Sequence, residues 1–435
     1  MSTREGDKDA PKGVVKRRRY RRTWPQRLAL CASTLTGVAC LTSACGIWYA
    51  NHQLGRLQRV DITHITPGDI LAASGPTATT RPGETTTTTE PDLPVVDLKA
   101  QNFLIVGSDS RGCISPDSPY YGGLYDGTDT GTNSDTIMLI RADPSTSRAA
   151  ILSFPRDLWV KLADGNNSGK INSVFQDANP SRLVRTIELN FQLKVDHYIN
   201  VDFCAFKDIV DAVGGVGVPF VFPARDLHTG LEILQVGCHT FAGDEALAYA
   251  RSRYYEWFNG QRWISDETSD FGRIARQQDF VKRSIAKAID KGVTRPSVAQ
   301  KLLNAAIARV KVDRSLTPND MLTLASKLKG FDPGQVRTYR IEGSSGDPIY
   351  IDTNSSTNRG ILKVFRGQAR LKDAPDPATF TDADTTTSGA TTSTTVSRSS
   401  TTTSQSGDST TSTTAVVDVK ENVVGIAPPK DLACR

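Results

Sequence analysis

Three short apolar runs, each beside charged residues, constrain the fold of this chain more than any other feature. The runs and their neighbours are Asn102–Ser108 before Asp109 and Arg111, the run after Asp135, and Ala149–Phe154 before Pro155 and Arg156. Runs of this length, bounded by polar residues, are typical of β-strands. Polar residues at strand ends predict the ligand-binding edge of a sheet in an α/β domain. Two carboxylates and several arginines at such an edge indicate a divalent metal and a phosphorylated ligand.

Helix-type patterns alternate with strand-type runs along the rest of this region. The predicted elements are a strand at Val195–Val201, a helix at Phe203–Val213 that Gly214 and Gly215 end, and helices at Glu245–Arg253, Asp270–Ile289 and Gln300–Val310. This alternation predicts an α/β domain in which helices cover a central sheet.

The first 50 residues predict a membrane anchor. Residues 1–27 contain ten Lys and Arg against three acidic residues, and the 23 residues Leu28–Ala50 carry no charge. Such a stretch can cross a bilayer, and the basic residues before it place its N-terminal side in the cytoplasm. We therefore expect a single-pass protein of the cell membrane, with everything after residue 50 extracytoplasmic. The alternative is a lipoprotein signal cleaved at Cys45, which delivers the same exterior domain.

The chain beyond its basic tail is almost neutral, with 42 Lys and Arg against 44 Asp and Glu. The basic charge of the whole chain is thus a property of the tail, and we expect no nucleic-acid partner. Composition predicts a Thr/Pro-rich spacer at 51–97, a folded domain at 98–372, an unfolded Ser/Thr-rich linker at 373–416 and a C-terminal segment at 417–435. That last segment regains apolar residues, so it either packs back on the domain through a disulfide or frays.

Four cysteines lie beyond the apolar segment, at Cys113, Cys204, Cys238 and Cys434. In an oxidising compartment we expect disulfides, and four cysteines permit three pairings. No Cys-x-x-Cys spacing is present, so a zinc site is not expected.

Charged residues border the apolar stripe of the predicted helix Asp270–Ile289. Asp270, Arg273 and Gln277 follow one line beside the stripe rather than opposite it. Contact with a ligand is one interpretation of this line, and structural ion pairing within the domain is the other.

The nearby arginines favour a functional interpretation of the carboxylates Asp109 and Asp135. Alone, an Asp at a strand end is most often a cap or a turn residue. Arg251 and Arg253, two residues apart, can grip a diphosphate through their planar forks. With Arg156, the set fits Mg²⁺ held by one or two carboxylates and phosphate oxygens. Phosphoryl transfer needs little beyond a metal, guanidinium groups and a positioned nucleophile.

Other enzyme signatures fit poorly. Gly165–Ile171 resembles a P-loop, but it is one residue short and has isoleucine where Ser or Thr binds Mg²⁺. Gly107–Arg111 lacks the Gly-x-Ser-x-Gly order of a nucleophile elbow. The five histidines have no metal-binding spacing, and His197 is expected to be a packed residue rather than a base.

Seven segments occur in a characteristic order, at Phe103–Arg111, Ser134–Met138, Leu152–Asp157, Lys170–Asn172, Asp211–Gly215, Gly243–Arg253 and Asp270–Gln278. Together they resemble the LytR-CpsA-Psr (LCP) family of bacterial envelope enzymes. Each segment alone is weak evidence, but seven in order behind a basic tail and one apolar span are specific.

The resemblance implies a three-layer α/β/α domain with a central mixed sheet. It implies a phosphotransferase that moves a glycopolymer from a polyprenyl-diphosphate carrier to a peptidoglycan hydroxyl and releases polyprenyl phosphate. Its partners would be that lipid-linked glycan, peptidoglycan and membrane lipid. The polyprenyl tail would lie in an apolar tunnel between sheet and helices, whose lining the sequence does not identify.

The resemblance also implies residue roles. Asp109 and Asp135 would bind Mg²⁺ or Mn²⁺. The sequence does not identify the general base, for which Asp109 is only a candidate. The catalytic set is Asp109, Arg156, Arg251 and Arg253, and the substrate-binding set is Arg111, Lys170, Arg273 and Gln277.

Two departures and two alternatives remain. Asn133 stands where many members have arginine, so that phosphate contact is in doubt. The segment Tyr254–Ser269 contains Trp257, Phe258 and Trp263, and is an acceptor-glycan platform, a membrane-touching loop or a plain surface insertion. The alternative functions are a non-catalytic envelope module that binds polyprenyl-phosphate lipid or glycan, and a lipid pyrophosphatase that uses water in place of the sugar hydroxyl.

Overall fold

The fold was analysed in a computed structural model of the chain. It describes residues 48–49, 51–66, 100–110, 112–125, 134–143, 148–165, 167–292, 296–327, 332–371, 416–429 and 434. The chain divides into two units, Met1–His52 and Gln53–Arg435. In the first unit, the Trp48 ring stacks on His52.

The expected membrane anchor at 28–50 lies outside the described residues, apart from Trp48 and Tyr49. Within the described ranges, no helix is both long enough and apolar enough to span a membrane.

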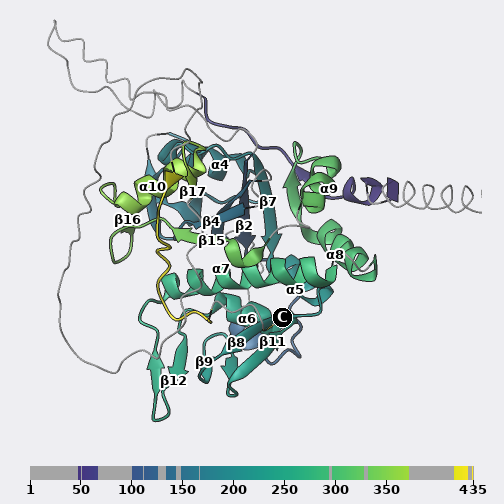
Figure 1. The fold of residues 1–435 in the computed structure, drawn as a ribbon, viewed down its shortest axis with the longest axis vertical. Coiled ribbons are helices and arrows are strands. Elements are labelled where there is room, and N and C mark those ends of the chain that lie inside the picture. Colours follow the sequence, from purple (N-terminus) through teal and green to yellow (C-terminus); the bar gives the residue numbers. More distant parts are fainter. Residues whose placement is uncertain are drawn as a thin grey trace, which may run out of the picture. The chain divides into compact units, whose positions relative to one another are not determined.

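A seven-stranded sheet forms the centre of the second unit (Figure 1). Its strands, in spatial order, are β1 (Gln58–Val60), β14 (Lys311–Asp313), β7 (His197–Asp202), β2 (Gln101–Ser108), β3 (Ser134–Asp143), β4 (Arg148–Ser153) and β15 (Arg337–Arg340). Strand β2 is parallel to β7 and antiparallel to β3. The sheet is therefore mixed, as predicted, and the three apolar runs form the adjacent strands β2, β3 and β4.

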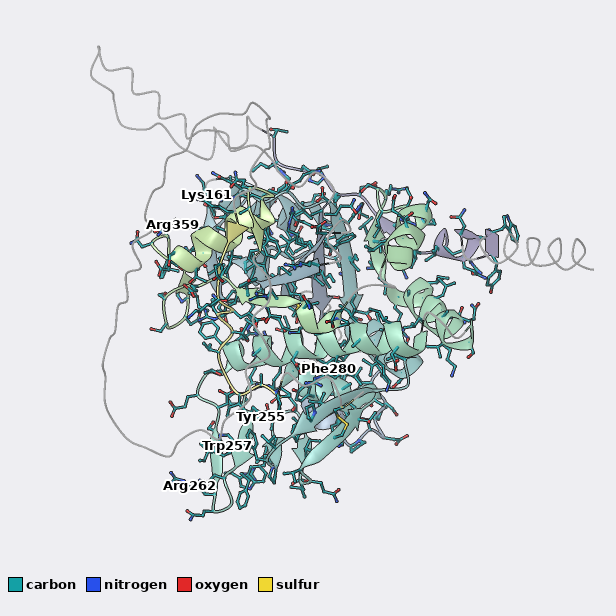
Figure 2. All side chains as sticks on the ribbon, viewed as in Figure 1. Lys161, Tyr255, Trp257, Arg262, Phe280 and Arg359 are labelled. Atoms are coloured by element: carbon teal, nitrogen blue, oxygen red, sulfur yellow. A yellow bond between two sulfur atoms is a disulfide. The ribbon has the colours of Figure 1, made fainter. Side chains whose placement is uncertain are left out.

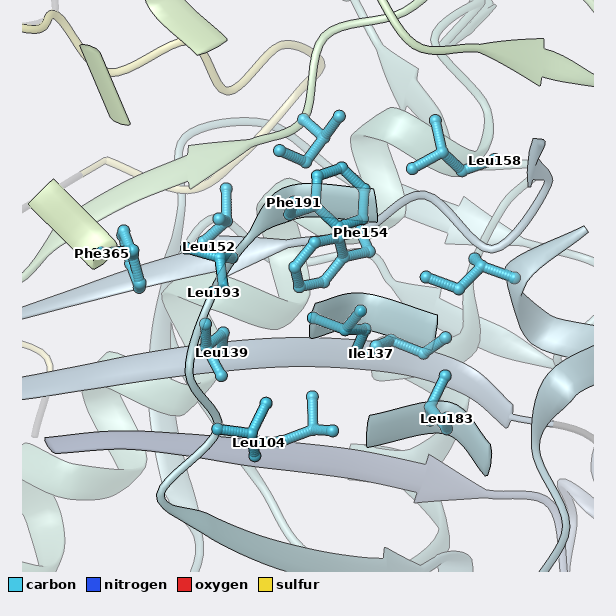
Figure 3. Packing of buried hydrophobic residues seen from close by; sticks show 14 of the residues in the cluster. Leu104, Ile137, Leu139, Leu152, Phe154, Leu158, Leu183, Phe191, Leu193 and Phe365 are labelled. Atoms are coloured by element: carbon cyan, nitrogen blue, oxygen red, sulfur yellow. The ribbon is translucent and has the colours of Figure 1, made fainter. Parts of the chain in front are cut away.

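Helices cover both faces of this sheet (Figure 1). On one face, α4 (Ser181–Phe191) and α10 (Ser356–Phe365) pack on strand residues such as Leu104, Leu139 and Leu152 (Figure 3). The other face carries α5 (Phe203–Ala212), α7 (Asp270–Lys287), α8 (Pro296–Arg309) and α9 (Pro318–Lys327). Since successive strand residues point to opposite faces, the same strands supply both cores. Each leucine fully buried in this way contributes about 1.5–3 kcal/mol.

Two small antiparallel sheets lie on the far side of α7 and pack with α6 (Gly243–Arg251) (Figure 1). One pairs β8 (Val216–Phe220) with β11 (Gly237–Phe241), and the other contains β10 (Leu231–Ile233), β9 (Ala224–Asp226), β12 (Glu256–Phe258) and β13 (Trp263–Ser265). The remaining α-helix and strands are short, namely α3 (Tyr121–Leu124), β5 (Leu158–Lys161), β6 (Ser168–Lys170), β16 (Ile349–Tyr350), β17 (Arg370–Leu371) and β18 (Val416–Val417).

The aromatic segment after α6 forms the β12–β13 hairpin, which carries the labelled Trp257 and Arg262 in Figure 2. Trp257 packs on Phe222 at 4.9 Å between ring centroids, and Phe258 packs on Trp263 at 5.4 Å. The three interpretations of this segment stay predictions.

Residues next to α5 determine where this helix begins and ends. The Asp202 side chain caps α5 by accepting a hydrogen bond from the Ala205 N–H at 2.6 Å. After α5, Gly214 and Gly215 take φ values of 79° and 83°, which a side chain would disfavour. The predicted helix Glu245–Arg253 was too long at its end, because α6 stops at Arg251. Arg253 therefore belongs to the following loop.

The four described cysteines form the disulfides Cys113–Cys204 and Cys238–Cys434. Before the second disulfide, residues 416–429 lie against the domain. The Glu421 carboxylate accepts a hydrogen bond from the Thr338 N–H at 2.8 Å, and the Ile426 carbonyl accepts one from Arg276 at 3.0 Å. Of the two alternatives for this segment, the structure has the packed one.

Candidate active site

Strands β2 and β3 bring Asp109 and Asp135 to one edge of the sheet. Because the strands are antiparallel, the end of β2 lies beside the start of β3. Thr136 and Ser134 pair with consecutive residues of β2, which leaves Asp135 as the extra residue of a β-bulge. A bulge re-aims a side chain, and both carboxylate residues line the same cavity.

This polar cavity has a volume of about 360 Å³. It gathers six of the predicted site residues, namely Asp109, Asp135, Arg156, Arg251, Arg253 and Arg273. These residues are up to 164 positions apart in the chain, so only the folded domain makes them neighbours.

Three guanidinium groups share the Asp135 and Asp270 carboxylates. Arg156 and Arg253 each place a nitrogen 3.0 Å from Oδ1 of Asp135. Arg273 lies 2.8 Å from Oδ1 of Asp270 and donates a hydrogen bond of 2.8 Å to the Asp135 carbonyl. Since Arg273 is almost fully buried, this network fixes the guanidinium groups before any ligand arrives.

Burial and neighbouring charges shift the pKa values of Asp135 and Arg253 in this network. Burial alone would raise the pKa of Asp135, but attraction to Arg273, Arg253 and Arg156 lowers that pKa to about 2. Burial lowers the pKa of Arg253 to about 10, and repulsion from Arg273 adds to this shift. The arginines thus repel one another, and a bound anion such as a diphosphate would relieve the repulsion.

Arg251 makes different contacts from Arg253. As the last residue of α6, it donates hydrogen bonds of 3.3 Å to the carbonyls of Gly123 and Leu124. Its guanidinium group also lies 4.9 Å from the centre of the Phe203 ring. Because α6 ends between the two arginines, both line the polar cavity but contact different partners.

A second, apolar cavity of about 290 Å³ adjoins the polar one. Strands β2 and β3 and helices α5, α6 and α7 line it, with side chains such as Ile105, Met138, Phe206, Leu247 and Val281. Asp135 and Arg251 line both cavities. The sequence did not identify the lining of an apolar cavity between sheet and helices. In the structure, the facing sides of the sheet and of three helices form this lining.

Of the predicted site residues that the structure describes, Gln277 and Lys170 do not line the polar cavity. Gln277 lies one turn beyond Arg273, lines the apolar cavity and donates a hydrogen bond of 2.9 Å to the Ala250 carbonyl. Lys170 pairs with Asp157 at 3.0 Å and with Asp347 at 2.5 Å. Arg111, like Asn133, lies outside the described residues.

Six lining residues of the polar cavity were not predicted as site residues, namely Gly123, Asn172, Asp226, His228, Thr229 and Tyr254. Asn172 ends one of the seven segments, so a signal for it was available. Asp226 and His228 lie around a short strand with no recognisable motif, and their position depends on packing alone.

The donor chemistry of the polar cavity suits a hard divalent cation. Within the described part of the chain, no group of three or more Asp, Glu, His or Cys side chains is placed to hold a metal ion. Mg²⁺ commonly takes only one or two carboxylates and completes its shell with water and substrate phosphates. Asp109 and Asp135, lining one cavity with four arginines, fit that smaller donor set.

The LytR-CpsA-Psr family model matches residues 74–372, which is more than half of the chain. The chain belongs to this family. The expected resemblance is therefore confirmed.

Relatives support this placement in the LytR-CpsA-Psr family. TagV of Bacillus subtilis, named a polyisoprenyl-teichoic acid–peptidoglycan teichoic acid transferase, is 30% identical over 301 residues, which cover 66% of this chain and 69% of TagV. LcpB of Corynebacterium glutamicum, named a probable cell wall biosynthesis protein, is 33% identical over 203 residues, which cover 46% of this chain and 45% of LcpB. The solved LytR-Csp2A-Psr enzyme from Actinomyces oris aligns with a TM-score of 0.51 at 20% identity, covers 71% of this chain and 95% of its own, and supports the fold alone.

Proposed function

We propose that this protein is a Mg²⁺-dependent phosphotransferase that moves a glycopolymer from a polyprenyl-diphosphate carrier to a peptidoglycan hydroxyl. Polyprenyl phosphate is the product released. The carrying observation is that the polar and apolar cavities share Asp135 and Arg251. A ligand that fills both needs an anionic part joined to a long apolar part, which describes a lipid diphosphate.

The arginines would bind and orient the diphosphate. Arg156 and Arg253, held on Asp135, present guanidinium groups suited to phosphate oxygens. Arg251 lies at the junction of the two cavities, where the lipid meets the phosphates. Negative charge that develops on the departing polyprenyl phosphate would be stabilised by these fixed cations, a contribution that is large in a cavity already organised.

Asp109 and Asp135 would hold Mg²⁺ or Mn²⁺ together with the phosphates. The ion, when bound, would neutralise phosphate charge and align the two reacting oxygens. The low pKa of Asp135 keeps its carboxylate ionised at neutral pH, as a metal ligand must be.

We also propose that the folded domain lies outside the cell membrane, behind a single N-terminal span. The disulfides Cys113–Cys204 and Cys238–Cys434 support this location, because disulfides persist in oxidising compartments. The named activity of TagV, which joins a polymer to peptidoglycan, is consistent with the same side of the membrane.

Turnover of a defined donor tests the proposed function. The full chain in detergent would be given a synthetic prenyl-diphosphate-linked disaccharide, peptidoglycan oligomers and Mg²⁺, and the products would be followed by mass spectrometry. We expect a phosphodiester-linked glycan on peptidoglycan and free prenyl phosphate. The reaction should stop with EDTA and with Arg156→Ala, whose fold should be intact.

Other products would identify the alternatives. Free glycan phosphate without peptidoglycan linkage would indicate a lipid pyrophosphatase. Tight binding of the donor without any turnover would indicate a non-catalytic envelope module. Full activity of Arg156→Ala would contradict the assignment of the polar cavity.

A further inference from the structure

The rim of the polar cavity carries a stacked pair of rings. The His228 and Tyr254 rings lie 4.0 Å apart between centroids at an interplanar angle of 28°, and both residues line the cavity. Both are open to solvent, since the His228 side chain is 65% exposed and Tyr254 is 57% exposed. The pair is therefore accessible to a ligand that enters the polar cavity from solvent.

One buried carboxylate holds the backbone of both residues. Asp226 is fully buried and accepts hydrogen bonds of 2.9 Å from the backbone N–H groups of His228, Arg253 and Tyr254. The Ser252 hydroxyl donates a further bond of 2.7 Å to the same side chain. Because Arg253 is tied to Asp135, the rim pair is held at a defined position relative to the diphosphate-binding arginines.

The loop of His228 is also fixed from the opposite side. A Cβ atom at Gly123 would lie 2.6 Å from the His228 carbonyl oxygen, so α3 packs directly against this loop. Gly123 in turn accepts a hydrogen bond from Arg251. The loop of His228 is thus connected to Arg251 through Gly123 and to Arg253 through Asp226.

Among the described lining residues, few side chains are suited to accept a proton at neutral pH. Asp135 is engaged by three arginines, and both oxygens of Asp226 already accept hydrogen bonds. Asp109, a candidate base from the sequence alone, is a metal ligand in the proposed function. His228 remains, and an imidazole exchanges its proton between about pH 5 and 8.

We propose that His228 is the general base of the transfer, an inference that rests on the proposed function. Its Nδ1 lies 3.7 Å from Oδ1 of Asp226, which is too far for a hydrogen bond. We assign the proton transfer to Nε2, because Nδ1 is the ring nitrogen that lies near Asp226. The other groups that share its cavity are Tyr254, Arg251, Arg253, Arg156, Arg273, Asp109 and Asp135.

The step balances without an added reagent. The acceptor hydroxyl oxygen forms a bond to the phosphorus that carries the glycan, while the bond from that phosphorus to the bridging oxygen breaks. The hydroxyl proton passes to Nε2 of His228, and polyprenyl phosphate leaves with the bonding electron pair. Solvent then removes the proton from the exposed ring.

Kinetics of the full chain with the prenyl-diphosphate-linked disaccharide and peptidoglycan oligomers test this role. We expect His228→Gln to lower kcat by about 10²-fold or more, with the KM values little changed. The acidic limb of the kcat profile between about pH 5 and 8 should disappear with the imidazole. Added imidazole should restore activity to His228→Ala, which a merely structural role would not produce.

A second histidine provides the matched control. His64 pairs with Glu188 at 2.8 Å and does not line the polar cavity, so His64→Gln should retain the wild-type rate and pH profile. Thermal unfolding of His228→Gln should match the wild type, because the His228 side chain is exposed.

Each other outcome would overturn a defined statement. A wild-type pH profile in an active His228→Gln would exclude the base and leave the proposed function standing. A raised KM alone, with kcat and its pH profile unchanged, would make His228 a binding residue and also overturn the inference. Failure of the wild type to turn over the donor would instead overturn the proposed function itself.

Discussion

The polar and apolar cavities share a wall but are built in different ways. The polar cavity is made of residues at strand ends, a helix end and loops, and ion pairs hold its side chains in place. The apolar cavity is lined by the inward faces of regular strands and helices. Ion pairs therefore hold the polar cavity in shape, whereas the packing of helices on the sheet sets the volume of the apolar one. The two cavities should respond differently to substitution.

The shared wall should be the most sensitive position. Arg251→Ala removes the cation at the junction of the two cavities, together with its contacts to Gly123 and Leu124. We expect turnover of the prenyl-diphosphate-linked disaccharide to fall by about 10²–10³-fold, since fixed cations act on charge that develops in the transition state. Arg225→Ala is a matched control because Arg225 contacts Glu256 and Trp263 and lines neither cavity. Equal activity of Arg251→Ala and Arg225→Ala would contradict the assignment of Arg251 to the active site.

Removing the charge of Asp135 should lower the stability of the folded domain. The folded-state pKa of about 2 is below the usual 3.8, so the ionised carboxylate stabilises the fold above about pH 4, and this stabilisation is lost as the pH falls toward 2. Asp135→Asn should lower the free energy of unfolding at pH 7 by about 2 kcal/mol. Denaturant unfolding across this pH range would measure the difference.

The matched control for Asp135 is an exposed ion pair. Asp164 pairs with Arg182 and Arg185 but is 44% exposed, so Asp164→Asn should change stability by less than about 1 kcal/mol. If Asp135→Asn were as stable as the wild type from pH 7 to pH 2, attraction to the arginines would not be what holds the polar cavity together.

Filling the apolar cavity should affect the lipid rather than the chemistry. Ile209 lines it from α5, and Ile209→Trp would occupy space needed by a long prenyl chain. We expect KM to rise about tenfold for a long-chain donor and little for a short-chain one. Ile307→Trp on α8 is the control, because Ile307 is partly buried outside this lining. The same increase for both chain lengths would count against a lipid in the cavity.

The smallest effect is expected at Lys170. Its ammonium group pairs with Asp157 and Asp347 and does not line the polar cavity, although the sequence placed it among substrate contacts. Lys170→Met should change kcat/KM by less than about fivefold, because pairs of this exposure contribute little. A loss comparable with that of Arg251→Ala would return Lys170 to the substrate site.

The order of residues in the sequence determined the elements and part of the site. The apolar runs predicted β2, β3 and β4, and the 3.6-residue periodicity predicted α5 and α7 with small errors at their ends. Asp109, Asp135 and Arg156 were recognisable because each lies directly beside such a run. These signals act over a few residues, where backbone preference and the alternation of side chains decide the local structure.

Only the tertiary structure decided which distant residues share a cavity. It joined the Asp226 loop to the residues after α6, turned Gln277 toward the apolar cavity, and chose one of three cysteine pairings. It also placed His228 beside arginines from other parts of the chain. Such contacts depend on how helices and strands pack together, and the local sequence does not encode that packing because its interactions join residues tens to hundreds of positions apart.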